Sequence, residues 1–280
     1  MTNEPTINVL AEGVLDGKVA VVSGGGSGIG RAIALELVRI GAKVTICGRR
    51  PEPLEETASM APEGAIDTVV CDIREEDQVN SLVDGTLERH GRIDILVNNA
   101  GGQFLSPAED ISPKGFRTVI QLNLEGTWLM THAVATKAFI PSGRGGKVVS
   151  ITLTPHTGLA GMAHSSAARA GVENLMKVLS IEWARFGIDL VAVAPGLVNT
   201  ETFRTKYPQE IRDALTDHLL QGAPTEPEDV AQTVAFIVSP GGRSISGSVI
   251  NVDRAHDLAQ APWPPGDVKT SSGDIPREER

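Results

Sequence analysis

The segment KVAVVSGGGSGIGR, residues 18–31, decides the fold. A short run of β-branched and small apolar residues predicts a strand, and apolar positions such as Ile29, Ile33 and Leu37 then recur at helical spacing. The glycines between them lack a Cβ atom, so backbone amides and the positive end of a helix can approach a pyrophosphate. This order predicts a dinucleotide-binding unit, with a purely structural glycine turn as the alternative.

The same alternation of strand and helix patterns continues from Gly13 to Leu258. Several of the strand patterns are continuously apolar, which is typical of strands covered on both faces. We therefore expect an α/β fold, a Rossmann-like, doubly wound parallel sheet of about seven strands with helices on both faces. Ligands of such sheets bind beyond the carboxyl ends of the strands. The predicted strands are 18–23, 43–47, 67–71, 94–98, 147–152, 190–194 and 249–252.

The predicted domain, residues 13–258, lies between two segments of different composition. Residues 1–12 are expected to form a short N-terminal extension. Residues 259–280 are rich in proline, with serine, glycine and charged residues between, which predicts a loosely held C-terminal arm. We expect Trp263 of this arm to pack on the chain or on a partner subunit.

Composition and charge exclude several classes of protein. The 280 residues are 41% hydrophobic and 21% charged, which suits one large folded domain and not a disordered chain. The 25 basic and 35 acidic residues give a net charge of −10, which disfavours nucleic-acid binding. No apolar run approaches the ~20 residues of a membrane helix, and the N-terminus lacks a secretory signal, so no membrane association is expected.

The cysteines and the C-terminus bear on metal binding and localisation. Cys47 and Cys71 form neither a metal-ligand spacing nor a disulfide framework. The C-terminal residues 277–280 do not resemble a peroxisomal address of the S-K-L type. The sequence therefore predicts no metal site and a reduced, cytoplasmic protein.

The spacing of the glycines is Gly24-x3-Gly28-x-Gly30, and three further motifs follow it in order. They are the segment NNAG at 98–101, Asn123 in a long helix, and the segment PG at 195–196 with Thr200 beyond it. With these motifs the chain resembles the short-chain dehydrogenase/reductase family over residues 15–255. The resemblance implies a nicotinamide cofactor held by Ser23, Gly24, Gly26, Ser27, Gly28, Ile29, Gly30, Ile73, Asn99, Ala100, Gly101, Arg169, Pro195, Gly196, Val198 and Thr200.

The end of the second strand predicts which cofactor is used. An acidic residue there would bind a ribose 2′-hydroxyl, but Gly48 takes that place and Arg49 and Arg50 follow. A guanidinium favours a 2′-phosphate. We therefore expect NADP(H), with Arg49 as the main contact, unless both arginines are only solvated loop residues. Asp72 resembles the residue that binds the adenine amino group in relatives, with a helix N-cap as the alternative.

The catalytic positions depart from those of most relatives. Aligned on residues 170–171, Ser165 stands where most relatives have a catalytic Tyr, and Arg169 stands where they have a Lys. The only tyrosine, Tyr207, is distant in the sequence, within a predicted substrate loop at 198–222. The usual catalytic serine is replaced near Leu153, which Thr152 and Thr154 flank.

Several side chains are candidates for the missing roles. Arg169 is expected to bind the nicotinamide ribose or polarise a carbonyl, against a structural ion pair, and it cannot relay protons. Ser165 offers a hydroxyl donor, or fills the helix face. His164 can protonate an enolate, although a lone histidine is more often structural.

Other candidates lie in the loop after the fifth predicted strand and in the long helix. His156 is a second candidate acid, because its loop should lie above the cofactor. Thr152 and Thr154 are candidates for the serine role. Asn123 is expected to hold a water by distorting its helix, as the resemblance implies.

The pattern of replacement indicates a substrate class. Residues 97–109 and 164–172 resemble trans-2-enoyl-CoA reductases of the peroxisomal type, and the related 2,4-dienoyl-CoA reductases also lack the usual Tyr. This resemblance implies NADPH-dependent reduction of an enoyl-CoA or a similar activated alkene. The alternatives are an NADP-dependent carbonyl reductase with His156 or His164 as a rearranged proton donor, or a cofactor-binding protein without catalysis. Relatives pack helices such as 116–140 and 164–186 across subunits, so a homotetramer or homodimer is expected.

Overall fold

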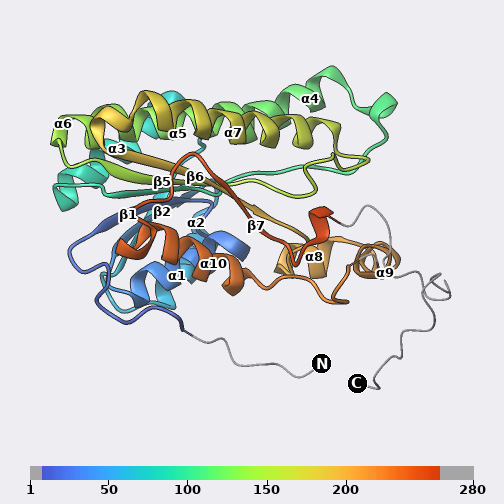
Figure 1. Ribbon diagram of the computed structural model, residues 1–280, viewed down its shortest axis with the longest axis horizontal. Helices are drawn as coiled ribbons and strands as arrows, with labels where there is room; N and C mark the ends of the chain where they lie inside the picture. The colour runs from blue at the N-terminus through green and yellow to red at the C-terminus, as the bar shows by residue number, and fades with distance from the viewer. Residues whose placement is uncertain (1–7, 218, 259–280) are drawn as a thin grey trace, which may run out of the picture.

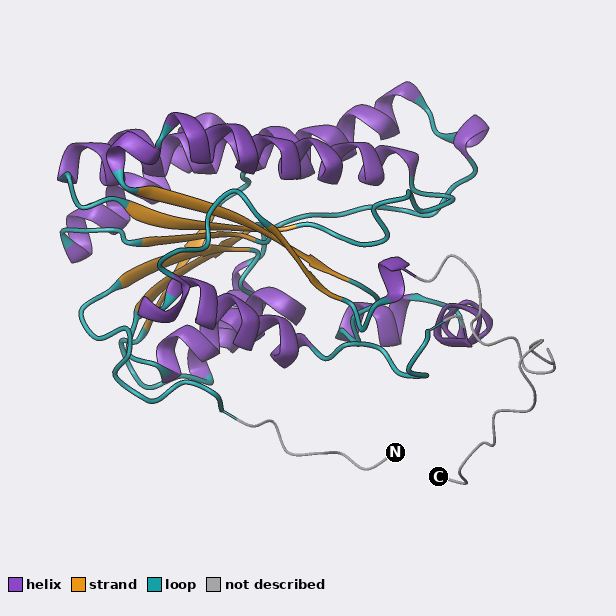
Figure 2. Cartoon of the chain, in the orientation of Figure 1, coloured by secondary structure: helices purple, strands orange, loops and turns teal. Residues whose placement is uncertain are grey.

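A computed structural model describes residues 8–217 and 219–258. Its centre is a parallel sheet of seven strands in the order β3-β2-β1-β4-β5-β6-β7, with helices above and below (Figures 1 and 2). The predicted doubly wound fold is confirmed. Trp263, most of residues 1–12 and the arm from residue 259 lie outside the described residues. The strands are β1 (Val19–Ser23), β2 (Lys43–Gly48), β3 (Ile66–Val70), β4 (Ile95–Asn98), β5 (Gly146–Ile151), β6 (Ile188–Pro195) and β7 (Val249–Val252).

The order of the strands reverses at β1. This strand pairs in parallel with β2 on one side and with β4 on the other. The chain therefore crosses from one half of the sheet to the other between β3 and β4. Loops after β1 and β4 leave in opposite directions at such a point and open a crevice. The glycine turn at 24–28 follows β1 and therefore lies at this crevice.

Two helix layers cover the sheet. One layer contains α1 (Gly28–Arg39), α2 (Pro51–Ser59) and α10 (Pro227–Val238), and the other contains α3 (Glu76–His90), α4 (Pro113–Ile120), α5 (Gly126–Val134) and α7 (Ala163–Glu182) (Figure 1). The short helices α8 (Glu201–Lys206) and α9 (Gln209–Asp217) follow β6, and α6 (Ile140–Ser142) precedes β5.

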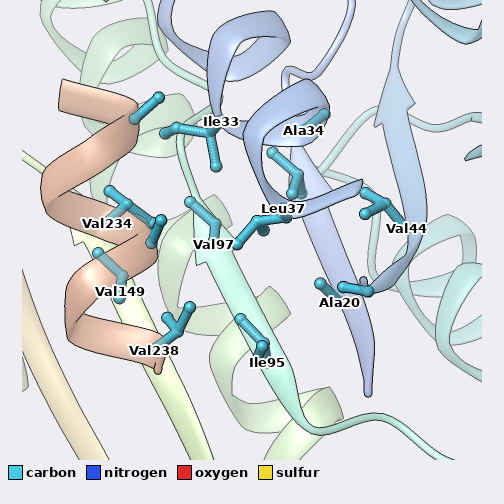
Figure 3. Close-up of a cluster of buried hydrophobic side chains, with 14 of the residues drawn as sticks. Ala20, Ile33, Ala34, Leu37, Val44, Ile95, Val97, Val149, Val234 and Val238 are labelled. Atoms are coloured by element: carbon cyan, nitrogen blue, oxygen red, sulfur yellow. The ribbon is translucent and has the colours of Figure 1, made fainter. Parts of the chain in front are cut away.

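Each helix layer buries an apolar face against the sheet. In the first layer Leu37 of α1 and Val234 of α10 pack over Val97 of β4 (Figure 3). In the second layer Val134 and Met176 pack with Leu96 on the opposite face of the same strand. Burial on both faces explains why the strands are continuously apolar, and it makes the strand ends rigid supports for a site.

The helix that carries Asn123 is distorted. Helices α4, α5 and α6 form one continuous run that is interrupted by two π-helical segments, Gln121–Glu125 and Ala135–Phe139. Asn123 lies in the first of these segments and is completely buried. An extra residue in a helical turn redirects the side chains beside it and is frequent at functional sites.

Candidate active site

Two adjoining cavities lie at the carboxyl ends of β1, β4, β5 and β6. The first has a volume of about 320 Å³ and is lined by the glycine turn, the end of β2 and the loop after β3. The second has a volume of about 470 Å³ and is lined by the loops after β4, β5 and β6. They share one wall, so a single extended ligand can occupy both. The residues of this shared wall are Ile29, Asn99, Gly101, Thr200 and Thr202.

The glycine turn fits the wall of the first cavity because it lacks side chains. Gly24 has φ +68° and Gly28 has φ +52°, conformations that favour glycine. A Cβ atom on Gly24 would lie 2.9 Å from the Cα atom of Ala100, and one on Gly25 would lie 2.6 Å from Ile46. The turn therefore accepts no side chain and leaves its amides open to an anion at the start of α1.

Two predicted cofactor residues, Ser23 and Gly30, lie beneath the turn and line neither cavity. Ser23 is buried, and its hydroxyl accepts hydrogen bonds of 3.0 Å from the amides of Asn99 and Ala100. Asn99 in turn donates to the carbonyl oxygens of Ser23 and Gly24. A Cβ atom on Gly30 would overlap the Gly24 carbonyl. Ser23 and Gly30 therefore shape the turn from below, and their contact with a cofactor stays a prediction.

The remaining predicted residues of the glycine turn and the NNAG segment do line the first cavity. Arg49 and Arg50 lie at its rim, at the end of β2, and in the described part of the chain neither forms an ion pair. They are free to bind a ligand phosphate. The other predicted residues along this wall are Gly24, Gly26, Ser27, Gly28, Ile29, Ile73, Asn99, Ala100 and Gly101.

Asp72 also lines the first cavity, but it is not the N-cap of α3, which is Glu75. The guanidinium of Arg74 lies 2.5 Å from the Asp72 carboxylate and holds the pKa of that carboxyl below its usual value. Gln78 accepts a hydrogen bond from the Asp72 amide. Arg74 was not among the predicted site residues, although its place two residues after Asp72 is visible in the sequence.

Arg169 of α7 projects into the second cavity as a buried charge. It is 7% exposed, and Nη1 donates to the Ile151 carbonyl oxygen at 2.7 Å, while Nη2 lies 3.4 Å from Oδ1 of Asn123. Nε has no partner, and no carboxylate of the described residues pairs with the guanidinium. Burial lowers the pKa of Arg169 to about 10. The alternative of a structural ion pair is therefore wrong, and the site is short of hydrogen-bond acceptors.

Asn123 acts within the wall of the site. Its Oδ1 accepts a hydrogen bond from the Gly102 amide at 2.9 Å, and its Nδ2 donates to the Gly102 carbonyl at 3.0 Å. The side chain does not line either cavity. Together with the contact to Arg169, these bonds join the π-helical turn to the loop after β4 and to α7.

Thr152 and Thr154 line the second cavity at the end of β5. Both are 5% exposed. Thr152 donates weakly to the Val193 carbonyl at 3.4 Å, but the hydroxyl of Thr154 has no partner in the described chain. A buried hydroxyl without a partner costs free energy, so Thr154 is the better placed of the two to bind a polar ligand atom.

Ser165 and His164, both candidates for the chemistry with a structural role as the alternative, line neither cavity. Ser165 donates to Oε1 of Gln103 at 3.2 Å, and it is Gln103 that lines the second cavity. Nδ1 of His164 accepts from the Ser165 amide at 2.7 Å, and its ring packs edge-on against Phe104 at 4.3 Å. Burial lowers the pKa of His164, which keeps the ring neutral. Nε2 of His164 is buried without a partner in the described chain, but the ring lines neither cavity and packs behind the wall of the second one.

His156 is held by carboxylates and does not line the cavity. Its Nδ1 lies 2.6 Å from Asp257, and its Nε2 lies 3.1 Å from Glu173 of α7. Burial lowers the pKa of His156, but the hydrogen bond and charge of Asp257 and the charge of Glu173 outweigh it and raise the pKa above its usual value. His156 therefore joins three segments, the loop after β5, α7 and the segment after β7.

The loop after β6 contributes several lining residues to the second cavity. Pro195, Gly196 and Val198 line it, and Thr200 lies on the shared wall while its hydroxyl accepts a hydrogen bond from the Phe203 amide as the N-cap of α8. A cofactor contact and a capping role are therefore both compatible with the position of Thr200.

Among the lining residues of the second cavity that were not predicted as site residues, two carry a side-chain proton that can be transferred. Tyr207, between α8 and α9, lines this cavity beside Phe203, with ring centroids 5.6 Å apart. His256, just after β7, lines the same cavity. Tyr207 lay in a predicted substrate loop, but nothing in the local sequence marked His256. Within the described residues no group of three or more histidines, cysteines and acids could hold a metal ion, and no helix is long and apolar enough to cross a membrane.

Comparison with known proteins agrees with this geometry. The family model described as enoyl-(acyl carrier protein) reductase matches residues 24–254, from the glycine turn to just after β7. The chain belongs to the short-chain dehydrogenase/reductase family. Peroxisomal 2,4-dienoyl-CoA reductase of Arabidopsis thaliana is 34% identical over 251 residues, covering 86% of this chain and 84% of that protein.

Solved structures of the family are equally similar. A citronellol catabolism dehydrogenase of Pseudomonas aeruginosa PAO1 is 38% identical, with a TM-score of 0.79 over 89% of this chain and 99% of that one. A short chain dehydrogenase of Bacillus anthracis is 33% identical, with a TM-score of 0.81 over 88% of this chain and 99% of that one. Family membership makes the chain an oxidoreductase of the type that uses a nicotinamide cofactor, with 2,4-dienoyl-CoA reductases among its relatives.

Proposed function

We propose that this member of the family is an NADPH-dependent reductase of an enoyl-CoA or a similarly activated alkene. The observation that carries the proposal is the change at the two usual catalytic positions. A buried arginine without a carboxylate partner stands at the predicted Lys position, and Ser165, at the predicted Tyr position, donates to Gln103 and does not line the cavity. On the alignment predicted from the sequence, no phenol stands at the position of the usual catalytic Tyr.

The residues present fit a dinucleotide. The glycine turn forms a cradle that a Cβ atom would fill, and the unpartnered Nε of Arg169 fits a ribose hydroxyl at the shared wall. Arg49 would bind the 2′-phosphate of NADPH, with Arg50 beside it, because both lie unpaired at the rim of the first cavity. Thr200 on the shared wall would meet the carboxamide.

Reduction of an alkene conjugated to a thioester requires an oxyanion site more than an acid at the oxygen. When bound, the cofactor supplies a hydride to the β-carbon, and negative charge then develops on the thioester oxygen. The hydroxyl of Thr154 forms no hydrogen bond in the described chain, so it can donate to the substrate. Gln103 accepts from Ser165 through Oε1, which leaves its amide NH₂ as a second donor. Both line the second cavity, and such oriented donors stabilise developing charge.

The second cavity also suits an acyl chain. Much of its wall is apolar and comes from the loops after β4 and β5 and from α8 and α9, so it can exclude water from the reacting carbons. Arg169 is the one permanently charged residue lining it in the described chain. The apolar lining residues include Leu105, Leu153, Leu159, Met162, Leu197, Phe203 and Leu215.

A carbonyl reductase is the second candidate, because Tyr207 and His256 line the cavity and both can donate a proton. The deciding experiment measures NADPH oxidation with a trans-2-enoyl-CoA, acetoacetyl-CoA and a simple ketone. We expect consumption with the enoyl-CoA alone. Consumption with the ketone alone would identify a carbonyl reductase, and tight NADPH binding without any turnover would identify a protein that has lost catalysis.

We also propose a homotetramer or homodimer. The layer of α4, α5 and α7 leaves large apolar side chains exposed on the described chain, among them Trp128 on α5 and Ile181 on α7, which is 79% exposed. Exposed apolar residues that gather on one layer mark an interface between subunits. These are the helices for which the sequence predicts subunit contacts.

A further inference from the structure

The proposed reaction leaves one role without a residue, the delivery of a proton to the α-carbon. Arginine, threonine and glutamine side chains do not serve as acids near neutral pH, which removes Arg169, Thr154 and Gln103. Among the described residues that line the second cavity, Tyr207 and His256 carry a proton that can be transferred. The backbone and the hydrogen-bonding neighbours of His256 favour it over Tyr207 as the proton donor.

The backbone before His256 is strained. Arg254 has φ +52° and Ala255 has φ +64°, and they are the only residues other than glycine with positive φ in the described chain. Side chains disfavour this left-handed region, so such strain persists only where surrounding structure imposes it, and it clusters at functional sites. These two strained residues immediately precede the histidine that enters the cavity.

A buried carboxylate imposes this conformation. Asp253, which is 7% exposed, accepts a hydrogen bond of 3.1 Å from the Ala255 amide on Oδ1 and one of 2.8 Å from the Asp257 amide on Oδ2. The Asp253 carbonyl oxygen also accepts from the His256 amide at 3.0 Å. One residue thus fixes the backbone on both sides of His256.

The next residue is tied to the loop that carries the threonines of the site. Asp257 accepts hydrogen bonds from the backbone amide and Nδ1 of His156, both at 2.6 Å, and from Asn251 at 3.0 Å. His156 itself reaches Glu173 of α7. The turn that carries His256 is therefore bound to the loop after β5, which begins with Thr152 and Thr154.

The ring of His256 is open to a ligand. It lines the second cavity together with Thr154 and Arg169, and its Nδ1 is buried without a partner in the part of the chain that the structure describes. Asp257 beside it is hydrogen-bonded to His156 instead. Buried polar atoms without partners are rare in native proteins, and they are expected where a ligand supplies the partner.

We propose that His256 is the catalytic acid that protonates the α-carbon. The inference rests on the proposed function. Hydride addition at the β-carbon moves the alkene electron pair to the thioester oxygen as an enolate. The enolate then takes a proton from a ring N–H of His256, the C–H bond forms at the α-carbon and the carbonyl re-forms. The ring regains its proton from water, so each turnover consumes one NADPH and one proton.

The test compares His256→Gln with the wild type, each as the full-length chain, in D₂O. Wild-type enzyme reducing a trans-2-enoyl-CoA with NADPH should place deuterium on one face of the α-carbon only. The His256→Gln variant should bind NADPH with unchanged affinity, lose about 10²-fold or more in kcat, and give both configurations because water then protonates either face. Added imidazole should restore part of the rate.

Two further variants separate the alternatives. Tyr207→Phe should retain a single configuration at the α-carbon, whatever happens to its rate, and His90→Gln at the end of α3, which lines neither cavity, should behave as the wild type. A His256→Gln enzyme that keeps both the wild-type rate and a single configuration overturns the proposal, as does loss of configuration in Tyr207→Phe alone. A wild type that binds NADPH but reduces no alkene refutes the proposed function itself. This outcome is distinct from a failure of the His256 proposal, because it is seen in the unsubstituted enzyme.

Discussion

Arg169 and Ile151 are joined by a hydrogen bond of 2.7 Å from Nη1 of the guanidinium to the backbone carbonyl oxygen at the end of β5. This bond holds a permanent charge beside Gly101, a residue of the wall that the two cavities share. Since no carboxylate of the described chain accompanies it, the charge is held by backbone and amide oxygens alone. Its surroundings are built for a ligand that supplies further acceptors.

Replacement of Arg169 separates binding from stability. Arg169→Ala should raise the Kd for NADPH by about tenfold or more, because a hydrogen bond from a charged group contributes about 1.5–3 kcal/mol. The melting temperature should fall little, because the variant also removes a buried charge that has no ionic partner and is costly to bury. Titration of NADPH fluorescence and thermal unfolding measure the two effects. Arg185→Ala, on the surface after α7, is the matched control, and an unchanged Kd in Arg169→Ala would exclude the ribose role.

Cofactor preference should depend on the end of β2. Arg49→Ala should weaken NADPH binding by about 10–100-fold, because one charge-assisted hydrogen bond to a phosphate is lost. NADH binding should stay nearly unchanged. Arg50→Ala should have the smaller effect. Parallel titrations with the two cofactors provide the measurement. Equal losses for NADPH and NADH would show that Arg49 acts on the adenosine or on the fold and does not select the 2′-phosphate.

The pairing of His156 with Asp257 and Glu173 should make stability depend on pH. The pKa of His156 is raised in the folded protein, so its contribution is fully present below the ordinary histidine pKa of about 6.5 and is lost as the pH rises through the raised value. His156→Asn should therefore lower Tm by about 2–4 °C at pH 6 and by less at pH 9. A gap that grows toward alkaline pH would contradict this assignment. In an Asp257→Asn background, the difference in Tm caused by His156→Asn should depend less on pH, because only Glu173 then pairs with the histidine.

Two glycine substitutions should have opposite effects on stability. Gly30→Ala places a Cβ atom against the Gly24 carbonyl and the Asn99 amide, and should destabilise by about 1–3 kcal/mol while weakening NADPH binding. Gly85→Ala in α3 meets no atom within 4 Å and should stabilise by about 0.5–1 kcal/mol. Denaturant unfolding of the two variants measures both values, and a neutral Gly30→Ala would show that the turn yields more than its packing indicates.

The exposed layer of α4, α5 and α7 predicts the effect of a surface charge. Trp128→Glu should lower the mass of the particle in multi-angle light scattering, because a carboxylate in an apolar contact between subunits is costly. Phe236→Glu on α10, which belongs to the opposite helix layer, tests whether that layer forms a second contact. A wild type that is already monomeric would contradict both proposed oligomers.

The fold could be predicted from the sequence because each strand is short, apolar and followed by a helix pattern. The site could be predicted less well. The motif residues lie beside the cavities, yet the turn buries Ser23 and Gly30, and the start of α7 turns His164 and Ser165 toward Phe104 and Gln103. Which face of a turn or helix meets the cavity depends on tertiary packing. His256 enters from a segment about a hundred residues away from its neighbours in the β5 loop, a proximity that no local pattern encodes.

The wall shared by the two cavities has a kinetic consequence. Ile29, Asn99, Gly101, Thr200 and Thr202 line both spaces, so the inner end of a bound dinucleotide would become part of the floor on which the second ligand rests. A substrate that bound first would lack these contacts with the dinucleotide and would obstruct the entry of the dinucleotide into the first cavity. We therefore expect a compulsory order of addition, with the nucleotide entering first and leaving last, and product NADP⁺ competing with NADPH alone.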